Sequence, residues 1–423
     1  MTAFDRIEQR MPELMAELAT ATVPDYFDDM LRQTGRTRQR PAWASLERWL
    51  PMDVVARPVS VRGPTLRPLL ILLLIGLLVA AGLALYAGSL RTRLPEPFGP
   101  ARNGPVFVTT GGDIVAIDPL TGARTTIVGG QTQDIAPWLS RDGQHVLFLR
   151  TQGGSHAQWI ANPDGSNQRE LVPAPVGWAE WAPSGDRIVV SRDVTLGGGT
   201  TTSIVNVADG TSTVLDAGSQ IDTPFWRPGH EQIGFTTDVG EGPEYHLMNA
   251  DGTGAHRVEG VSPDAINTPI FSADGSRLVY STWAEGGGLQ GRIHVVEIDT
   301  GVDRALMFDG SELTNEFPYQ FSPDGTKLLI ERHGGDASFE VNGEQGYRLV
   351  IAPADGGGPV IPIGPPMPSS TGGATAEFSP DGTQVLAFYK HDQSTWLLDA
   401  DGSGGEEVDW NPQGEFNWQR LAP

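Results

Sequence analysis

The 423-residue chain contains no cysteine. Neither a disulfide nor a thiolate metal site can form, so packing and hydrogen bonds alone must hold the fold together. Motifs that carry chemistry are missing too. The eight histidines show no H-E-x-x-H or H-x-H spacing, and no G-x-S-x-G nucleophile elbow occurs. We therefore expect no catalytic residue, no metal and no cofactor, and we predict that the protein is not an enzyme.

One acidic stretch, Asp399 to Glu406, superficially resembles a calcium-binding loop. Its glycine comes too early for that loop, and the third carboxylate of the consensus is missing. Because Asp-Gly pairs in similar surroundings recur along the chain, the chemistry of a tight turn explains the stretch better.

Positive charge is scarce. The 52 acidic residues outnumber the 29 lysines and arginines, which gives a net charge of −23, and the part beyond residue 68 carries all of the excess. Such a field disfavours nucleic acid and anionic lipid as partners of that part. We therefore expect no nucleic-acid binding.

Long apolar runs are absent, with one exception. Residues 69–86 form 18 consecutive uncharged, mostly apolar positions. As a helix they would cover roughly 27 Å, close to the hydrocarbon thickness of a bilayer. We predict a transmembrane helix over residues 68–90, followed by a linker over 91–102. A cleaved signal peptide is the alternative, but 68 residues precede the run and no clear small-x-small cleavage site follows it.

The arginines predict the orientation of that helix. Eight of them lie between residues 32 and 67, against two acidic residues, so the N-terminus should face the cytoplasm. The chain would then be a single-pass protein of the cytoplasmic (inner) membrane, with its larger part outside.

Residues 1–67 are predicted to form a short helical cytoplasmic segment with an arginine-rich linker. Apolar residues recur at helical spacing from Phe4 to Leu18. Farther on, Trp43, Leu46 and either Trp49 or Leu50 would share one helical face. That face suits either the membrane surface or a protein partner, and both readings stay open.

The rest of the chain is built from repeats. A turn of the Ser-Pro-Asp-Gly type recurs six times and follows a large apolar residue each time; we call these copies the first turn series. They lie at Ser140–Gly143, Ala182–Gly185, Arg227–His230, Ser272–Gly275, Ser322–Gly325 and Ser379–Gly382. Successive copies start 42, 45, 45, 50 and 57 residues apart, a period typical of four-stranded propeller blades. Proline, aspartate or serine, and glycine supply the backbone geometry that closes a hairpin.

A second turn series lies between these copies and has seven members. They are Asp118–Gly122, Asn162–Gly165, Ala208–Gly210, Asn249–Gly252, Asp299–Gly301, Ala354–Gly356 and Asp399–Gly402. Short apolar segments flank them, as expected of the turn between the third and fourth strands of a blade.

The first turn series has six members and the second has seven, and this difference indicates how the repeats close into a ring. The first unit, which begins near Val106, lacks an innermost strand, and Phe416 to Gln419 matches the residues that lead into each first-series turn. We therefore predict an all-β fold over residues 103–423, a seven-bladed β-propeller closed by the C-terminal strand beside Val106 to Thr109. Such closure leaves only short sheet edges.

A ligand site in such a ring would lie at the mouth of the central channel, just before the first-series turns. Alignment of the copies brings a ring of candidate positions together there. The predicted ligand-binding residues are Trp138, Trp178, Glu180, Gln320, Glu377 and Asn417. The last four are polar where packing alone would favour apolar residues. Solvation of a water-filled channel is the competing explanation.

The segments Phe321–Leu328 and Phe378–Val385, each followed by an Asp-Gly turn, resemble TolB-type propeller repeats. The resemblance covers about three-quarters of the chain and implies a propeller that binds proteins at its channel mouth, although the separate α/β domain of TolB is not evident. A short helical segment, one span and an exported propeller also resemble transmembrane regulators such as anti-sigma factors, here without a His-Cys zinc motif.

Two functions follow as expectations. The first is a non-catalytic, membrane-anchored propeller that binds a protein, peptide or glycan outside the membrane. The alternative is a signal transducer in which residues 1–60 bind a cytoplasmic regulator and the propeller senses. A hydrolase that uses Glu180 or Glu377 is the least favoured reading.

Overall fold

The computed structural model describes residues 73–78, 96, 98–195, 198–238, 243–266, 269–283, 291–309, 315–334, 340–341, 343–369, 373–410, 412 and 415–422. The chain divides into two units, Met1–Arg91 and Thr92–Pro423. In the first unit only residues 73–78 are described, and they are helical. The predictions for residues 1–67 and for most of residues 68–102 thus lie outside the described ranges. No helix within those ranges has the length and apolar content needed to cross a membrane.

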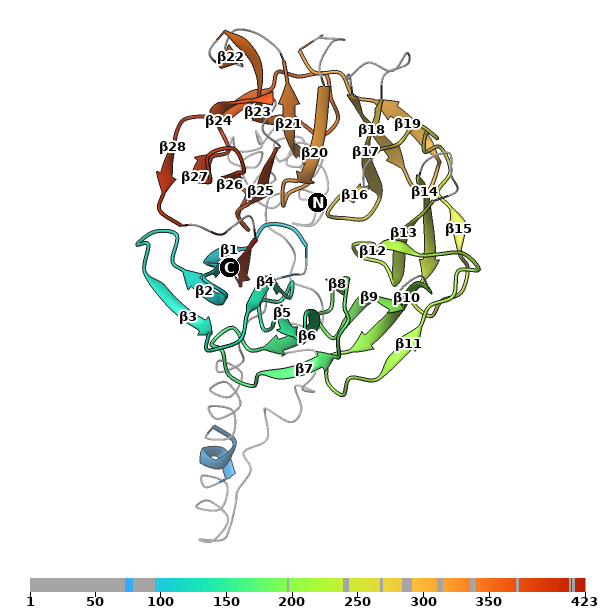
Figure 1. The fold of residues 1–423 in the computed structure, drawn as a ribbon, viewed down its shortest axis with the longest axis vertical. Helices are drawn as coiled ribbons and strands as arrows, with labels where there is room; N and C mark the ends of the chain where they lie inside the picture. The colour runs from blue at the N-terminus through green and yellow to red at the C-terminus, as the bar shows by residue number, and fades with distance from the viewer. Residues whose placement is uncertain are drawn as a thin grey trace, which may run out of the picture. The chain divides into compact units, whose positions relative to one another are not determined.

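The described strands of the second unit form seven antiparallel sheets arranged around a central axis (Figure 1). Blade one contains β29 (Phe416–Leu421), β1 (Arg102–Thr110), β2 (Asp113–Ile117) and β3 (Arg124–Val128). Blade two contains β4 (Asp134–Leu139), β5 (Val146–Gln152), β6 (Ser155–Ala161) and β7 (Arg169–Val172). Blade three contains β8 (Trp178–Trp181), β9 (Arg187–Thr195), β10 (Gly198–Asn206) and β11 (Ser212–Val214). Blade four contains β12 (Asp222–Trp226), β13 (Gln232–Asp238), β14 (Pro243–Asn249) and β15 (His256–Arg257).

The remaining blades follow the same order from the axis outward. Blade five contains β16 (Ile270–Phe271), β17 (Arg277–Trp283), β18 (Gly291–Glu297) and β19 (Val302–Ala305). Blade six contains β20 (Asn315–Phe321), β21 (Lys327–His333), β23 (Glu344–Pro353) and β24 (Ile361–Pro368), with the short β22 (Glu340–Val341) added beside β23. Blade seven contains β25 (Ala374–Phe378), β26 (Gln384–Tyr389), β27 (Ser394–Asp399) and β28 (Gly405–Val408). The predicted all-β, seven-bladed propeller is therefore confirmed.

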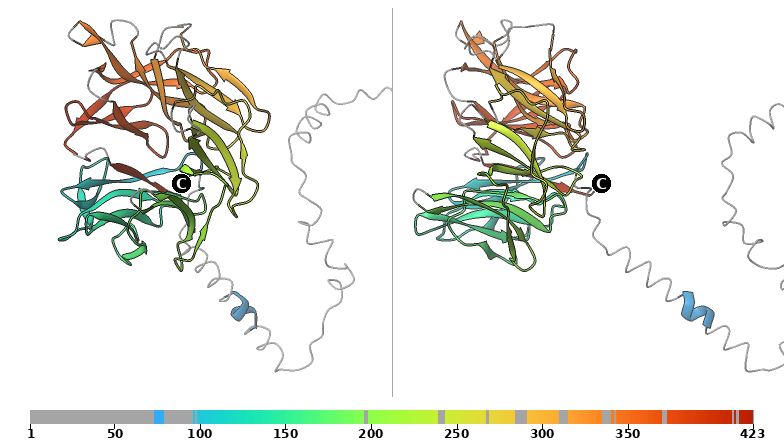
Figure 2. Two further views of the ribbon diagram at one scale, coloured as in Figure 1. Left: turned by 45° about the vertical axis from the view of Figure 1, so that its right-hand side comes forward. Right: turned by 90° about the vertical axis from the view of Figure 1, so that its right-hand side faces the viewer.

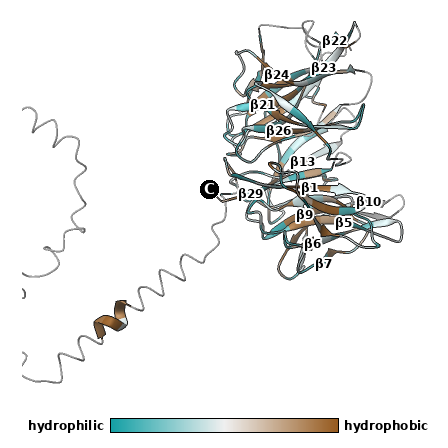
Figure 3. Ribbon diagram, turned by 90° about the vertical axis from the view of Figure 1, so that its left-hand side faces the viewer, coloured by the Kyte–Doolittle hydropathy of each residue, from teal (hydrophilic) through white to brown (hydrophobic). Residues whose placement is uncertain are grey.

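The position of a strand in its blade explains its composition. The second strands are buried on both faces because a neighbouring blade covers each face, so β21 is a nearly continuous run of buried residues. The fourth strands lie at the rim, and all three residues of β11 are exposed. Two views across the propeller show the sheets side by side (Figure 2), and apolar residues are concentrated in the strands rather than in the turns (Figure 3).

Blade one closes the ring as predicted. The C-terminal strand β29 pairs with β1, with Trp418 opposite Val106 and Asn417 opposite Phe107. The indole Nε1 of Trp418 donates to the carbonyl oxygen of Gly104 at 2.9 Å. Trp418 also packs in an apolar cluster with Val106 and with Leu386 of blade seven. One strand thus completes blade one and fills the boundary between blades seven and one.

The first-series turns have a shared hydrogen-bond pattern. In Ser322–Gly325 the Gly325 amide donates to the Ser322 carbonyl at 2.8 Å, and Gly325 has a positive φ of 71°. The carboxylate of Asp324 accepts from the Ser322 hydroxyl at 2.6 Å and from the Thr326 amide at 3.0 Å. Partial burial opposes ionisation of Asp324, but these hydrogen bonds keep its pKa below the usual value. The turn therefore holds an ionised aspartate in place.

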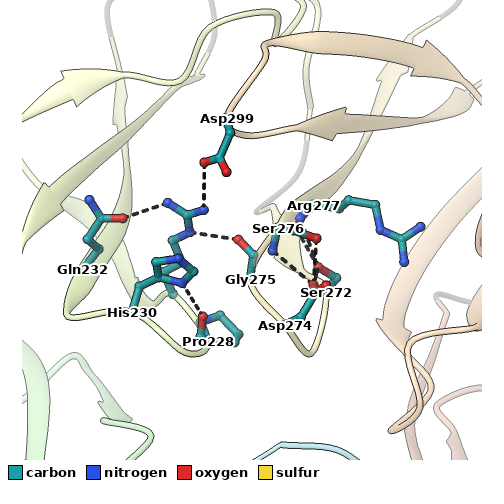
Figure 4. A network of polar contacts seen from close by, with 10 residues as sticks. Pro228, His230, Gln232, Ser272, Asp274, Gly275, Ser276, Arg277 and Asp299 are labelled. Carbon is teal, nitrogen blue, oxygen red and sulfur yellow. Dashed lines mark hydrogen bonds and ion pairs between the residues drawn. The ribbon is translucent and has the colours of Figure 1, made fainter.

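Blade four departs from this pattern, and its turn instead joins two blades. The Arg227 guanidinium donates to the Gln232 side chain at 2.8 Å, to the Gly275 carbonyl at 2.8 Å and to Asp299 at 3.4 Å. Figure 4 shows these three acceptors converging from both sides of the boundary between blades four and five. The arginine is 5% exposed, so blades four and five share a buried charge-assisted contact.

Closure by β29 predicts that Trp418 is essential for stability. Replacement of Trp418 by alanine should lower the free energy of unfolding by about 3 kcal/mol or more, because it leaves a cavity in the cluster between two blades. Urea unfolding followed by tryptophan fluorescence measures this change. Leu120, which is 91% exposed, provides the control: Leu120→Ala should change stability by less than about 0.5 kcal/mol. Equal effects of the two substitutions would contradict closure by this strand.

Candidate functional site

A cavity of about 390 Å³ lies where the inner strands reach the first-series turns. Inner-strand residues and first-series turns of several blades line it, together with Phe98 and Gly99 of the segment that precedes β1. Of the predicted site residues, four contribute to its lining: Trp138, Gln320, Glu377 and Asn417. Trp178 and Glu180 do not line it directly, although both interact with residues that do.

The polar inner-strand residues connect neighbouring blades. Asn417 of blade one accepts a hydrogen bond from the Leu139 amide of blade two at 2.8 Å. Glu180 of blade three accepts from the Trp226 amide of blade four in the same way. An inner strand is the edge of its sheet, so every second amide faces the channel without a partner in the ladder. A polar side chain of the preceding blade supplies that partner.

Glu377 makes the same contact at the closing boundary. Its carboxylate accepts from the Trp418 amide and, at 3.1 Å, from the side-chain amide of Asn417. Glu377, Asn417 and Leu139 therefore form a chain of contacts across blades seven, one and two. These contacts give a structural reason for polar residues that the sequence suggested as ligand contacts.

Two arginines at the mouth were not predicted from the sequence. Arg141 occupies the second position of a first-series turn, where the other copies carry proline or alanine. Arg420 lies two residues after Trp418 in β29 and also lines the cavity. Arg141 could have been recognised from the sequence as a candidate site residue, because it departs from the repeat. Arg420 could not, because nothing in the repeat sets it apart from other residues of the strand.

The electrostatics of the mouth differ from those of the acidic chain as a whole. Burial within the ring raises the pKa of Glu180 to about 8, although the nearby Arg141 opposes the shift. Burial likewise raises the pKa of Glu377 to about 7, against the opposing Trp418 amide and Arg141. The pKa of Arg420 falls to about 10 because of burial and repulsion by Arg141. The two glutamates are therefore partly protonated at neutral pH, which weakens the negative charge beside the two arginines.

Arg141 has an exposed side chain, but the residues that line the cavity surround it closely enough to disfavour its charge. Burial lowers the pKa of Arg141, and the attraction of Glu180 and Glu377 opposes the change.

Two tryptophans present exposed aromatic surface at the mouth, and Trp138 is the one that lines the cavity. Trp138 and Trp178 are 40% and 41% exposed. Their rings meet edge to face with centroids 6.1 Å apart, and the Trp178 indole donates to the Pro224 carbonyl at 3.1 Å. Half-exposed, rigid aromatic side chains of this kind offer a contact surface at low entropic cost.

The segment before β1 is fastened to the mouth. The Arg420 guanidinium donates to the carbonyl oxygens of Glu96 and Gly99 at 2.9 and 2.7 Å. The Arg141 guanidinium lies over the Phe98 ring at 5.1 Å from its centroid, a cation–π contact. The two arginines therefore hold a stretch of linker against the cavity.

The described histidines contribute to the blades rather than to a metal site. Three of them stack across strands on an aromatic ring and contact a carboxylate, as His294 does with Tyr280 and Asp303. The described residues hold no group of histidine and carboxylate side chains suited to a metal ion. In the stretch from Asp399, the Asp401 carboxylate accepts from the Ser403 amide at 2.9 Å, the local bonding expected of a turn.

Comparison with known proteins places this geometry among propellers. No protein-family model matches the chain. The propeller domain of the Trilobed protease from Pyrococcus furiosus, described as having an open velcro topology, is 13% identical, with 74% of this chain and 97% of that chain covered and a TM-score of 0.51. An oligogalacturonate lyase from Vibrio parahaemolyticus is 14% identical, with coverages of 72% and 92% and a TM-score of 0.51.

A TolB from Acinetobacter baumannii is also similar, at 17% identity, with coverages of 74% and 82% and a TM-score of 0.46. At these identities a likeness shows the fold alone, and the two structures at a TM-score of 0.51 are the ones that support it. The chain is therefore a β-propeller.

The raised pKa of Glu377 predicts a pH dependence of stability. Between pH 4.5 and about 7 the unfolded chain releases the Glu377 proton while the folded chain keeps it. The unfolded state therefore binds fewer protons, and this group's contribution to stability falls as pH rises. Glu377→Gln, which keeps an oxygen acceptor for the Trp418 amide, should be more stable than wild type by about 1 kcal/mol at pH 8.5 and by much less at pH 5.5.

Urea unfolding at the two pH values measures the difference. The exposed Glu406 of β28 supplies the matched control, since Glu406→Gln should change stability little at either pH. A Glu377→Gln variant that loses stability equally at both values would show that the carboxylate is ionised and stabilising throughout.

Proposed function

We propose that the protein is a non-catalytic β-propeller that binds a protein or peptide at its channel mouth, outside the cytoplasmic membrane. The observation that carries this proposal is the mouth itself. A cavity of about 390 Å³ adjoins two half-exposed tryptophans and two arginines. Concave sites that combine aromatic walls with a few fixed polar groups are typical of ligand binding. A glycan is the alternative ligand.

A binding role fits the use of the acidic side chains better than a catalytic role. A general acid or base needs a free oxygen within reach of its substrate. Glu180 and Glu377 each accept a backbone hydrogen bond from the next blade, which assigns both of them a structural task. The lyase and protease with similar propellers are enzymes, and their low identity transfers nothing beyond the fold.

The membrane anchor is part of the proposal. Its support is the uncharged run over residues 69–86, of which residues 73–78 form an exposed apolar helix. The arginine-rich stretch before the run supports a cytoplasmic N-terminus and a propeller on the opposite side of the inner membrane.

Site-specific cross-linking tests the channel mouth as the binding site. A benzoylphenylalanine at position 138 of the full chain, activated in intact cells, should capture a discrete partner. The same group at Val214, which is 62% exposed on the rim strand β11, is the matched control and should not capture it. Capture that is equal at both positions, or at the rim alone, would place the binding surface elsewhere.

A second function, transmembrane signalling, is favoured by one observation. The segment that leads from the first unit is fastened at the channel mouth through Arg420 and Arg141. A ligand that displaces Phe98 would therefore act directly on the linker. In this second function, residues 1–60 bind a cytoplasmic regulator such as a sigma factor.

Co-purification distinguishes the two functions. If the protein transduces a signal, a cytoplasmic regulator should co-purify with the full chain and be absent when residues 1–60 are deleted. A plain anchor should give the same set of proteins from both forms. Recovery of lipid alone with the full chain would remove the support for signalling while leaving the binding function intact.

A further inference from the structure

Several hydrogen-bond donors at the channel mouth have no acceptor. The side-chain nitrogen Nε2 of Gln320 and the Nε of Arg420 are buried without a partner among the described residues. Both residues line the cavity. A buried donor without an acceptor is unfavourable, so both side chains would gain by turning these groups toward an acceptor inside the cavity.

Arg141 adds a charge to this set. Its guanidinium lies over the Phe98 ring and makes no ion pair or hydrogen bond with the described part of the chain. It also lines the cavity. Arginine presents several N–H groups in a planar fork that matches a carboxylate.

Three polar side chains at the mouth already accept hydrogen bonds from the backbone of the next blade. Glu180 and Glu377 accept backbone amides of the next blades, and the Asn417 carbonyl oxygen accepts the Leu139 amide. Gln320 and Arg420, by contrast, each have a donor without an acceptor. Partial protonation of the two glutamates, whose pKa values burial raises, leaves the positive charge of the arginines incompletely balanced.

The same region already holds polypeptide. Arg420 binds the carbonyl oxygens of Glu96 and Gly99, and the Ala101 amide donates to the Pro380 carbonyl at 2.8 Å. Extended chain therefore fits against this rim through ordinary backbone contacts. These contacts favour a peptide over a sugar as the occupant of the neighbouring cavity.

We propose that the channel mouth binds a carboxylate of a peptide ligand, with Arg141 as its ion-pair partner, Gln320 as a hydrogen-bond donor and the Trp138 ring as an apolar wall. This inference rests on the proposed binding function and adds the chemistry of the ligand. The carboxylate provides the acceptors that the unpaired donors require, and its charge replaces the missing partner of the guanidinium.

Ligand-observed NMR with the purified full-length chain tests the assignment. The probes are a tripeptide with a free C-terminal carboxylate, the same tripeptide as its C-terminal amide, and an amide that carries one aspartate side chain. At least one carboxylate form should bind about tenfold more tightly than the plain amide, which corresponds to about 1.4 kcal/mol. The form that binds identifies the source of the carboxylate as a chain terminus or a side chain.

Matched arginine variants locate the contact. Arg141→Gln should remove the preference for carboxylate, whereas Arg141→Lys should keep part of it because the charge remains while the fork is lost. Arg124→Gln, which breaks an ion pair with Asp409 at the rim, should leave the preference unchanged. Urea unfolding of each variant shows whether the fold is retained, and Gln320→Leu gives an independent, smaller loss of binding if Arg141→Gln fails to fold.

Two outcomes would overturn the inference. Equal binding of the carboxylate and amide forms, or a preference that Arg141→Gln does not change, would exclude the ion pair. Binding of a digalacturonate through Arg141 with no binding of either peptide would exclude a peptide as the ligand. If cross-linking from position 138 still captures a protein, the binding function survives and only the carboxylate assignment fails; loss of that capture as well would remove both.

Discussion

The pairing of β29 with β1 is the contact on which the rest of this propeller depends. It joins residues at opposite ends of the repeat region, Trp418 and Val106, and places a tryptophan in the boundary between the last blade and the first. Without it the blades would form an open row with an unpaired edge at β1. Since the chain has no cysteine, non-covalent contacts alone close the ring.

The channel shows how a ring of separate sheets satisfies its innermost backbone. Each blade ends at the axis in an edge strand, and adjacent inner strands do not share a ladder. Glu180, Glu377 and Asn417 bridge that gap by accepting amides of the following blade. Burial raises the pKa values of the two carboxylates, although the nearby Arg141 opposes the shift. Glu377 and Asn417, which connect neighbouring blades, also line the cavity.

The repeat made most of the fold predictable. Turns with fixed backbone requirements recur at blade spacing, and the count of the two series indicated that the inner strand of blade one comes from the C-terminus. The added strand β22 was not predicted, although the 57-residue interval between Ser322 and Ser379 left room for it. Aligned positions also brought Trp138, Gln320, Glu377 and Asn417 to one cavity.

The sequence did not reveal what those residues contact. The sequence of an inner strand does not show whether its glutamate faces solvent, a ligand or a backbone amide of the next blade. The contact that the glutamate makes depends on the relative position of two blades. Arg420 reaches the cavity and the linker only because β29 lies beside β1, a contact between residues more than 300 positions apart. The membrane span, the localisation and the absence of catalysis stay predictions.

Closure by the last strand also has a consequence during biosynthesis. About 310 residues separate Val106 from its partner Trp418, and at ribosomal rates of about 5–20 residues per second their translation takes roughly 15–60 seconds. Throughout that interval the nascent blade one lacks its inner strand and exposes the apolar edge of β1. A newly made chain therefore carries an unpaired sheet edge at β1 until residue 421 has been made.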